Sequence, residues 1–317
     1  MSQFSQIALY IALPSLIFDL LWIINFMIRR ESFSQERKKH AGNHSSGYVS
    51  RNPDRRVRQA IEELLVGEPH AAVQLTNKAF KTKPERWPLL RQEIAQLPHT
   101  LAPAEMVKYR KEAIDAMKKT ASNNRSKSIN ACSVLIWGVW YLGHAHQTIA
   151  MDRAETWYDM ARAYENLANH LPEKGAALRE AGLNCCLNAL SSYRALNVVN
   201  QQITTLCLIG KISAQERSPD LEPNAHFQVA RDYYIQAHAL LRQASSVSLD
   251  LLSTIYAGIG DSCYALFQFQ HEGQYLQEAV QAYKELLTLY QEREPQNTSA
   301  INNIKAKLAL ITDRTWP

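Results

Sequence analysis

The segment from Tyr256 to Leu289 reads YAGIGDSCYALFQFQHEGQYLQEAVQAYKELLTL, and its residue spacing sets the expected fold. In the first half, large Tyr256 precedes small Gly260 by four residues. In the second half, Ala279 precedes Tyr283 by the same interval. Residues four apart lie on one face of an α-helix, so each half predicts a helix with a packing face. Together the two halves predict a helical hairpin.

The same pattern occurs twice earlier in the chain, at offsets of 49 or 50 residues. Three stacked hairpins would explain it, because small residues let neighbouring helices approach while large ones fill the spaces between hairpins. The corresponding positions are Trp157, Leu206 and Tyr256, then Ala161, Gly210 and Gly260 in the first helices, and Ala181, Ala230 and Ala279, then Cys185, Tyr234 and Tyr283 in the second.

Two segments resemble tetratricopeptide repeats: residues 72–84 (AVQLTNKAFKTKP) and residues 256–289. The resemblance lies in the small residue midway through the first helix, the Ala and Tyr of the second, and the closing Pro84. A period near 49 exceeds the usual one of about 34, which makes these units long-armed, divergent relatives. The resemblance implies a curved α-solenoid that binds peptides or partner proteins, and it implies no chemistry.

The remaining sequence also predicts helices, and alternating β-branched runs that would indicate strands are missing after residue 54. We therefore expect an all-α fold: a single N-terminal transmembrane helix followed by a TPR-like solenoid of antiparallel hairpins. A strongly apolar helix is expected at 129–151, and its apolar core of about 13 residues is too short to span a bilayer. The expected divisions are a transmembrane helix at 7–28, a basic polar juxtamembrane linker at 29–54, N-terminal helical pairs at 55–128 (57–66 with 71–82, and 87–96 with 103–118), and the repeat region at 129–317.

The predominantly apolar stretch from Ile7 to Ile28 predicts the membrane anchor. As a helix it spans roughly 33 Å, enough to cross a hydrocarbon core of about 30 Å. A cleaved signal peptide is disfavoured because no Lys or Arg precedes the apolar run and no small-residue cleavage site follows it. The positive residues after the anchor place the short N-terminus outside the cell membrane and the remainder in the cytoplasm.

Asp19 lies inside this apolar stretch, on a stripe of small residues. The stripe predicts a surface that packs against another integral membrane subunit, because small residues permit close backbone approach and an acid can hydrogen-bond across the contact. One alternative is a tolerated acid in a generic anchor, and another is a proton or ion relay shared with a second subunit. The predicted packing residues are Ala8, Ala12, Ser15 and Asp19.

Positive charge is concentrated next to the anchor. Residues 29–127 carry 21 basic and 11 acidic side chains, whereas residues from 128 onward carry 14 basic and 18 acidic ones. A basic segment beside a membrane is attracted to anionic lipid headgroups. Nucleic-acid binding is disfavoured because no nucleic-acid motif accompanies the charge. The residues expected to contact headgroups are Arg29, Arg30, Arg37, Lys38 and Lys39.

The five cysteines form no CxxC pair and most have apolar neighbours, which predicts buried reduced thiols and fits a cytosolic domain. A reversed topology would place the repeats outside the cytoplasm and, in a eukaryotic secretory setting, would open three sequons to glycosylation. Those sequons begin at Asn43, Asn124 and Asn297.

No catalytic motif is present. HExxH, GxSxG, P-loop and dinucleotide fingerprints are missing, and His144 and His146 fall on different faces of a helix. His226 and His238 lie on or beside a second helix, where a core or groove histidine is favoured over a metal ligand. Asp159, Glu165 and Asp261 fit the polar faces of amphipathic helices. We therefore expect neither an enzyme nor a cofactor.

The sequence favours a membrane-anchored scaffold or adaptor that recruits a protein or peptide to a membrane complex. The alternative is an integral subunit of a transport or proton-coupled complex that uses Asp19. If the first helix of each hairpin is the inner one, polar positions between the packing residues should face the partner. The other interpretation of these positions is an ordinary solvated helix surface. The candidate groove residues are Arg162, Asn166, Lys211, Asp261 and Gln268.

Overall fold

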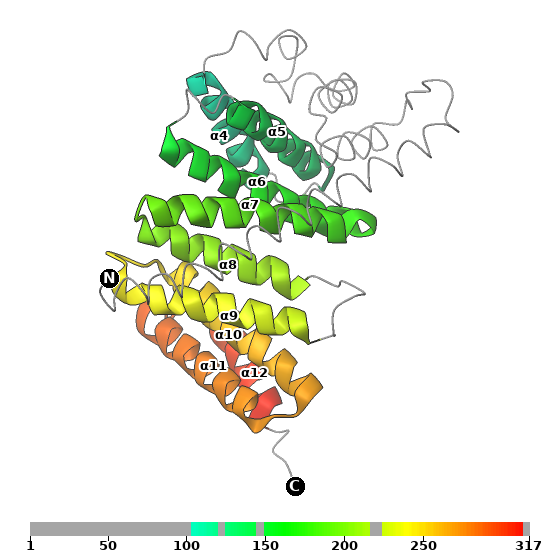
Figure 1. The fold of residues 1–317 in the computed structure, drawn as a ribbon. Coiled ribbons are helices and arrows are strands. Elements are labelled where there is room, and N and C mark those ends of the chain that lie inside the picture. Colours follow the sequence, from blue (N-terminus) through cyan, green and yellow to red (C-terminus); the bar gives the residue numbers. More distant parts are fainter. Residues whose placement is uncertain (1–102, 120–123, 144–148, 216–223, 313–317) are drawn as a thin grey trace, which may run out of the picture. The chain divides into compact units, whose positions relative to one another are not determined.

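The computed structural model describes residues 103–119, 124–143, 149–215 and 224–312. All of them belong to the compact unit formed by residues 83–317. This described part is almost entirely helical and contains no β-strand, so it is all-α (Figure 1). The predicted anchor, the Asp19 stripe, the headgroup-contacting cluster, the linker, every predicted helix before residue 103, and His144 and His146 lie outside the described residues.

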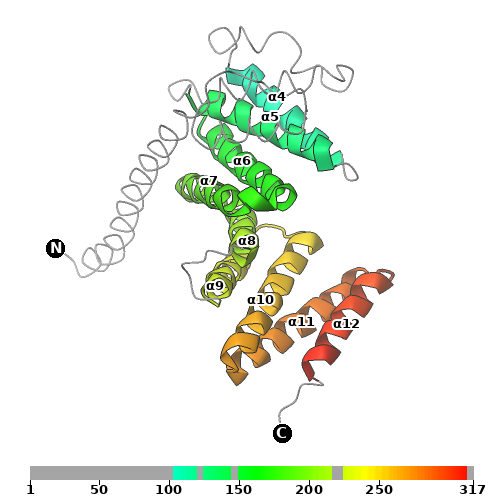
Figure 2. The same ribbon diagram turned by 90° about the vertical axis from the view of Figure 1, so that its right-hand side faces the viewer.

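Each described helix packs against the next one along the chain. Figure 2 shows this succession from the side. Short 3-10 helices, Pro172–Lys174 and Leu241–Gln243, occur at two of the turns. The α-helices are α4 (Pro103–Lys119), α5 (Asn124–Gly143), α6 (Ala150–His170), α7 (Gly175–Ala195), α8 (Val199–Gln215), α9 (Ala225–Leu240), α10 (Leu249–Gln270), α11 (Gly273–Arg293) and α12 (Thr298–Thr312).

The helix positions repeat with the period found in the sequence. The helices α6, α8, α10 and α12 begin at residues 150, 199, 249 and 298, so successive starts are 49 or 50 residues apart. Extensive contacts join α6 with α7, α8 with α9, and α10 with α11, which makes three hairpins. The first helices also touch across hairpins, α6 with α8 and α8 with α10. We call α6, α8 and α10 the first-helix layer.

Glycines in this layer accommodate tyrosine rings from the second helices. A Cβ added at Gly210 would lie 2.8 Å from the ring of Tyr234, and one added at Gly260 would lie 2.8 Å from the ring of Tyr283. The ring of Tyr234 also lies against Gly258, so it is held between α8 and α10. Real Cβ atoms do not approach other atoms so closely, and only glycine leaves the room that these rings occupy. Gly210 and Gly260 therefore let a neighbouring helix approach closely, as predicted for these small positions.

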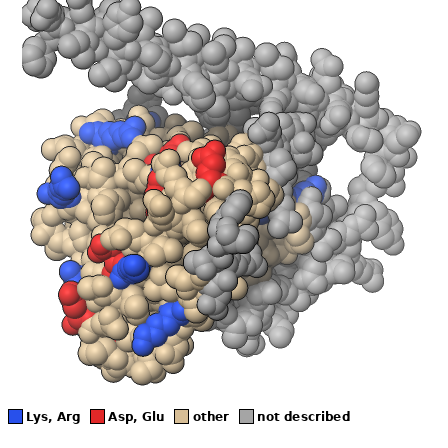
Figure 3. All heavy atoms as spheres, turned by 90° about the horizontal axis from the view of Figure 1, so that it is seen from below, with Lys and Arg blue, Asp and Glu red and all other residues tan. Residues whose placement is uncertain are grey.

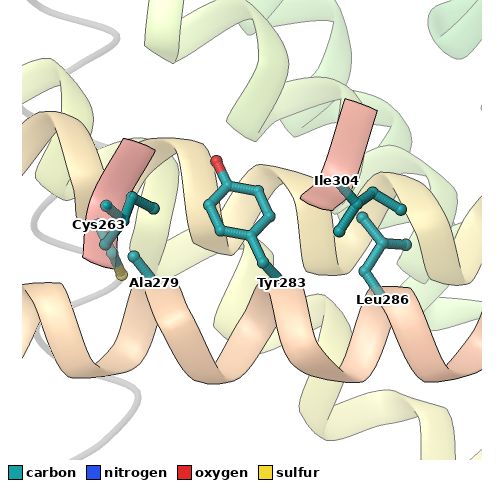
Figure 4. Close-up of a cluster of buried hydrophobic side chains, with 6 residues drawn as sticks. Cys263, Ala279, Tyr283, Leu286 and Ile304 are labelled. Atoms are coloured by element: carbon teal, nitrogen blue, oxygen red, sulfur yellow. The ribbon is translucent and has the colours of Figure 1, made fainter. Parts of the chain in front are cut away.

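The end of the stack has its own buried apolar cluster. Figure 4 shows Ala279, Tyr283 and Leu286 rising from α11 toward Cys263 and Ile304. The last helix, α12, closes this cluster because Ile304 and Ile311 face inward while most of its other positions are exposed. Its first turn is capped by the sequon residue Asn297, whose Oδ1 accepts a hydrogen bond from the backbone N–H of Ala300 at 3.2 Å.

The apolar sequence near residue 135 forms a buried helix, as predicted. In α5, Val134, Leu135 and Ile136 are fully buried against the neighbouring α4 and α6. The predicted bounds were wrong, because α5 runs from Asn124 to Gly143 and Met151 belongs to α6. Met151 packs against a separate cluster between α6 and α7. Within the described ranges, no helix combines the length and apolar character needed to cross a bilayer.

Candidate partner-binding face

The five predicted groove residues all lie on the first-helix layer. Arg162 and Asn166 are on α6, Lys211 is on α8, and Asp261 and Gln268 are on α10. Three of them are equivalent positions in successive hairpins, because Arg162, Lys211 and Asp261 each directly follow the small packing residue. The same position therefore recurs in each of the three first helices, and it holds two cations, Arg162 and Lys211, and one anion, Asp261.

An ion pair joins the first two helices of this layer. The ammonium of Lys211 lies 3.0 Å from Oε1 of Glu165, and the same oxygen accepts a hydrogen bond from Nδ2 of Asn169 at 2.8 Å. The lysine side chain is half exposed, whereas Glu165 is buried. The prediction that Glu165 lies on a polar helix surface was wrong, since this carboxylate sits between α6 and α8. Its burial is compatible with its charge because two donors reach it.

Two carboxamides beside this ion pair have oxygens without a donor. Oδ1 of Asn166 and Oε1 of Gln215 are buried atoms, and neither accepts a hydrogen bond within the described part of the chain. Both side chains are half-buried. The residues lie 49 positions apart, so they are equivalent in the α6 and α8 repeats. The sequence prediction included Asn166 and missed Gln215, although the repeat offset pointed to it.

Asp261 and Gln268 belong to a different part of the layer. The carboxylate of Asp261 accepts hydrogen bonds from the hydroxyl of Tyr283 and from the ammonium of Lys307, which join α10 to α11 and α12. Lys307 also lies over the Tyr283 ring, 5.2 Å from its centre. Gln268 is exposed near the end of α10. Across the described ranges, no hydrogen bond or ion pair links Asp261 or Gln268 to α6 or α8, whereas Lys211 is linked to α6 through Glu165.

The two described candidate histidines lie on α9, as predicted. Nε2 of His238 is 3.3 Å from the hydroxyl of Tyr256, and His238 is exposed. The ring of His226 lies beside that of Phe227, tilted by 43°, with ring centres 4.0 Å apart. Neither histidine belongs to a ligand cluster, since the described residues contain no group of three or more His, Cys, Asp or Glu side chains placed to hold a metal ion.

All five cysteines are buried and free, which confirms their predicted burial. Burial raises the pKa of Cys132 and Cys185 to about 12, because a thiolate is poorly solvated among apolar side chains. The pKa of Cys186 is raised for the same reason. Thiols that stay protonated near neutral pH are weak nucleophiles and weak metal ligands. All five lie among buried side chains, and Sγ of Cys263 also donates a hydrogen bond to Oε2 of Glu278 at 3.4 Å.

The sequence interpretation missed one buried charge, Arg110 on α4. Its side chain is fully buried, with Nε 3.1 Å from the carboxylate of Asp159 and Nη2 3.6 Å from that of Glu155 on α6. Nη1 donates to the backbone carbonyl of Asp152 at 3.2 Å and also bonds the hydroxyl of Thr156. This network attaches α4 to α6. Asp159, expected on a polar helix surface, is instead mostly covered and bound to the arginine.

The signal for Arg110 was present in the sequence. It lies four residues after Met106 and four before Ile114, both of which are buried. A cation at such a position on an apolar stripe indicates a buried ion pair, because an unpaired charge there would be strongly destabilising.

Charges of both signs are interspersed on the described surface seen in Figure 3, and most of that face is uncharged. A further ion pair joins α9 to α11, where Nη2 of Arg231 lies 2.7 Å from the carboxylate of Glu278. Most ion pairs of the described helices connect one helix to another, which is typical of structural ion pairs rather than of a catalytic site.

The candidate site is therefore the portion of the first-helix layer around Arg162, Asn166 and Lys211. Comparison of the chain with protein-family models and with curated proteins finds no match.

Proposed function

We propose that this protein is a membrane-anchored scaffold whose TPR-like α-solenoid recruits a protein partner to a membrane complex. The observation that carries the proposal is the stack of hairpins at a period of 49 or 50 residues, with first helices that contact one another. Stacked helical repeats of this kind present extended surfaces, and their common use is binding other proteins. Polar side chains at equivalent positions along the layer fit that use.

The anchoring part of the proposal rests on the sequence. The apolar stretch 7–28 is long enough to span a bilayer, and the basic residues after it suit anionic headgroups on the cytoplasmic side. The small-residue stripe that ends at Asp19 gives the anchor a surface for a second membrane subunit. The short N-terminus would then lie outside the cell membrane and the repeats inside.

A pull-down in mild detergent tests the proposal. The full chain is compared with a variant lacking residues 1–30, and captured proteins are identified by mass spectrometry. We expect two sets of partners, because the anchor and the repeats present separate surfaces. One set should be lost with the anchor, and the other should be retained by the repeats alone. Loss of every partner on removal of residues 1–30 would contradict a binding role for the repeats.

Asp19 supports a second candidate function, an integral subunit of a transport or proton-coupled complex. An acid at membrane depth is costly, and such residues often mark ion or proton paths. The variant Asp19→Asn separates the two functions, because an amide can still hydrogen-bond across a helix contact but cannot carry a proton. A scaffold should keep most of its assembly in this variant, whereas proton coupling should be abolished even in the intact complex.

A further inference from the structure

We propose that the repeats themselves contact an anionic membrane surface, through one end of the helical stack. At this end α6, α8 and α10 begin and α7 and α9 finish, on the left of Figure 1. The inference goes beyond the scaffold function, because it assigns a lipid-binding surface to the described helices, and it uses the proposed anchor only as a tether. We call this surface the basic edge, and its residues are Ile149, Arg153, Arg194, Leu196, Arg242 and Val247.

Contacts between the hairpins place these helix ends together. Met151, at the start of α6, packs against the buried cluster that contains Tyr193 near the end of α7. Gln202, near the start of α8, donates a hydrogen bond from Nε2 to the backbone carbonyl of Tyr193 at 3.2 Å. Arg194 also interacts electrostatically with Tyr233 of α9. The turns of the first two hairpins therefore form one continuous surface.

Aliphatic side chains are exposed on this edge. Ile149, which directly precedes α6, is 67% exposed, and Leu196 in the turn between α7 and α8 is 37% exposed. Val247, in the segment before α10, is half-buried. Single exposed aliphatic residues are common on protein surfaces, but these alternate with arginines. An apolar surface with basic residues around it is suited to the boundary between lipid headgroups and acyl chains.

The charges of the edge are complementary to anionic headgroups. Arg153, Arg194 and Arg242 are exposed, and none of them forms an ion pair with a residue in the described ranges. The acids of the same edge, Asp152 and Asp250, lie in the first turns of α6 and α10. The positive end of the helix dipole offsets a carboxylate there. The three guanidinium groups are thus free to bind lipid phosphates and carboxylates.

Other turns of the stack lack this combination. At the opposite end, the two described turns, 171–174 and 271–272, contain no arginine, and the exposed ring of Phe269 lies close in sequence to the exposed acid Glu272. The turn between α11 and α12 carries Glu292 and Glu294 beside Arg293. The basic edge is therefore confined to the first two hairpins.

The proposed anchor makes a weak surface sufficient. A tethered domain meets the bilayer at a high effective concentration, so contact needs no strong affinity of its own. An arginine near an anionic surface favours contact by about fivefold, so three of them together favour it by roughly a hundredfold. With helix ends on the bilayer, the helices extend away from it. The first-helix layer then stays clear of lipid and open to the partner.

A fluorescent label tests the contact in the full chain. Ser246→Cys places the label on the exposed segment before α10, and Gln277→Cys places it on α11, toward the opposite end. Each variant is labelled with NBD-maleimide, and the wild type, whose five cysteines are buried, gives the background. The chains are reconstituted in nanodiscs of phosphatidylcholine alone or with about a quarter phosphatidylserine. A nitroxide on the acyl chain close to the headgroup quenches an immersed label.

We expect the Ser246 label to be blue-shifted and quenched in discs that contain phosphatidylserine, and the Gln277 label to remain in water. In phosphatidylcholine alone, or at high salt, quenching of the Ser246 label should fall toward background, because the headgroup charge is absent or screened. Removal of the aliphatic groups by Ile149→Ser and Leu196→Ser should also reduce it.

Charge variants test the arginines directly. The triple variant Arg153→Gln, Arg194→Gln, Arg242→Gln should abolish quenching of the Ser246 label. Arg293→Gln is the matched control, because Arg293 is an exposed arginine at the same end but lies between two glutamates. It should leave quenching unchanged. Thermal midpoints show whether each variant folds. If the triple variant unfolds, the comparison of lipids and salt on the unsubstituted edge decides the result.

Equal quenching of the two labels, no quenching at Ser246, or full quenching in phosphatidylcholine alone would overturn the proposal. A blue shift in detergent that grows with protein concentration would overturn it too, because a second copy would then cover the edge. Size-exclusion chromatography of the discs tests the anchor separately. A chain that does not enter the discs contradicts the anchor, and the same labels read with added vesicles of the same lipids then test the edge.

Discussion

At the scale of single residues, the absence of one methyl group sets the distance between helices. Tyr234 and Tyr283 fill the room left by Gly210 and Gly260. In the α6 hairpin the equivalent pair is Ala161 and Cys185, so a slightly larger first-helix residue accompanies a much smaller second-helix residue. Among these three hairpins, the two with a tyrosine in the second helix therefore carry a glycine in the first, because the ring occupies the room that a Cβ would need.

We predict that Gly210→Ala and Gly260→Ala each destabilise the protein by about 1–3 kcal/mol, because the new methyl group would overlap a tyrosine ring. Gly273→Ala is the control, since a Cβ there meets nothing within 4 Å. That change should be neutral or slightly stabilising. Urea unfolding measures all three. Equal effects at Gly210 and Gly273 would contradict the packing explanation.

The buried cysteines predict a loss of stability at alkaline pH. The pKa of Cys132 and Cys185 is raised from an ordinary value near 9 to about 12, so the unfolded chain loses these protons first. Stability is then fully present below about pH 8 and falls as pH rises from about 9 toward 12, by up to roughly 1.4 kcal/mol per pH unit for each thiol.

Urea midpoints at about pH 7, 8, 9 and 10 check this dependence, and Cys185→Ala should flatten the decline between the last two values. The thiols should also resist Ellman's reagent near pH 8 until the protein is unfolded, because about one in 10,000 is ionised at a pKa near 12. Fast reaction of all five thiols in the native protein would show that they are not buried.

At the scale of helices, Arg110 determines how α4 attaches to the repeats. We predict that Arg110→Met destabilises the protein by about 2–4 kcal/mol, because it removes the buried cation that lies 3.1 Å from the mostly covered carboxylate of Asp159. Lys111→Met is the control. Lys111 also pairs with an acid of α6, Glu155 at 3.3 Å, but it is largely exposed, so its loss should cost under about 1 kcal/mol.

A double-mutant cycle with Asp159→Asn isolates the ion pair. The coupling energy between Arg110 and Asp159 should exceed the coupling between Lys111 and Glu155, since solvent screens the exposed pair more strongly. Equal coupling energies would show that Arg110 contributes only its packing volume.

The hairpins and their period were predictable because both depend on local spacing. Large, small and alanine positions recur every 49 or 50 residues, and the helix starts follow the same interval. The boundary between α5 and α6 was missed, although Gly143 and the largely polar sequence 144–148 interrupt the apolar run before Ile149. Glu165 was also missed, since its burial depends on which distant helix packs over it, and Arg110 was missed although its place between Met106 and Ile114 indicated burial. Gln215 could have been identified only from its offset of 49 residues from Asn166.

At the scale of the whole molecule, the proposed function assigns two separate binding surfaces to one chain. In that proposal the stretch 7–28 supplies a membrane-packing surface and the first-helix layer supplies a polar surface for a partner. A scaffold with this division should hold a membrane subunit at one end and a soluble partner at the other. Removing either surface should leave the other functional, because helical repeats are stabilised by contacts between neighbours along the chain.

The most direct test of the scaffold function measures where the partner retained by the repeats is found after membrane sedimentation. With the full chain, we predict that this partner sediments with membranes. With residues 1–30 removed, it should stay bound to the repeats while both proteins move to the supernatant. The scaffold function would be contradicted if the shortened chain still sedimented with membranes, or if the partner reached the membrane equally well without the full chain.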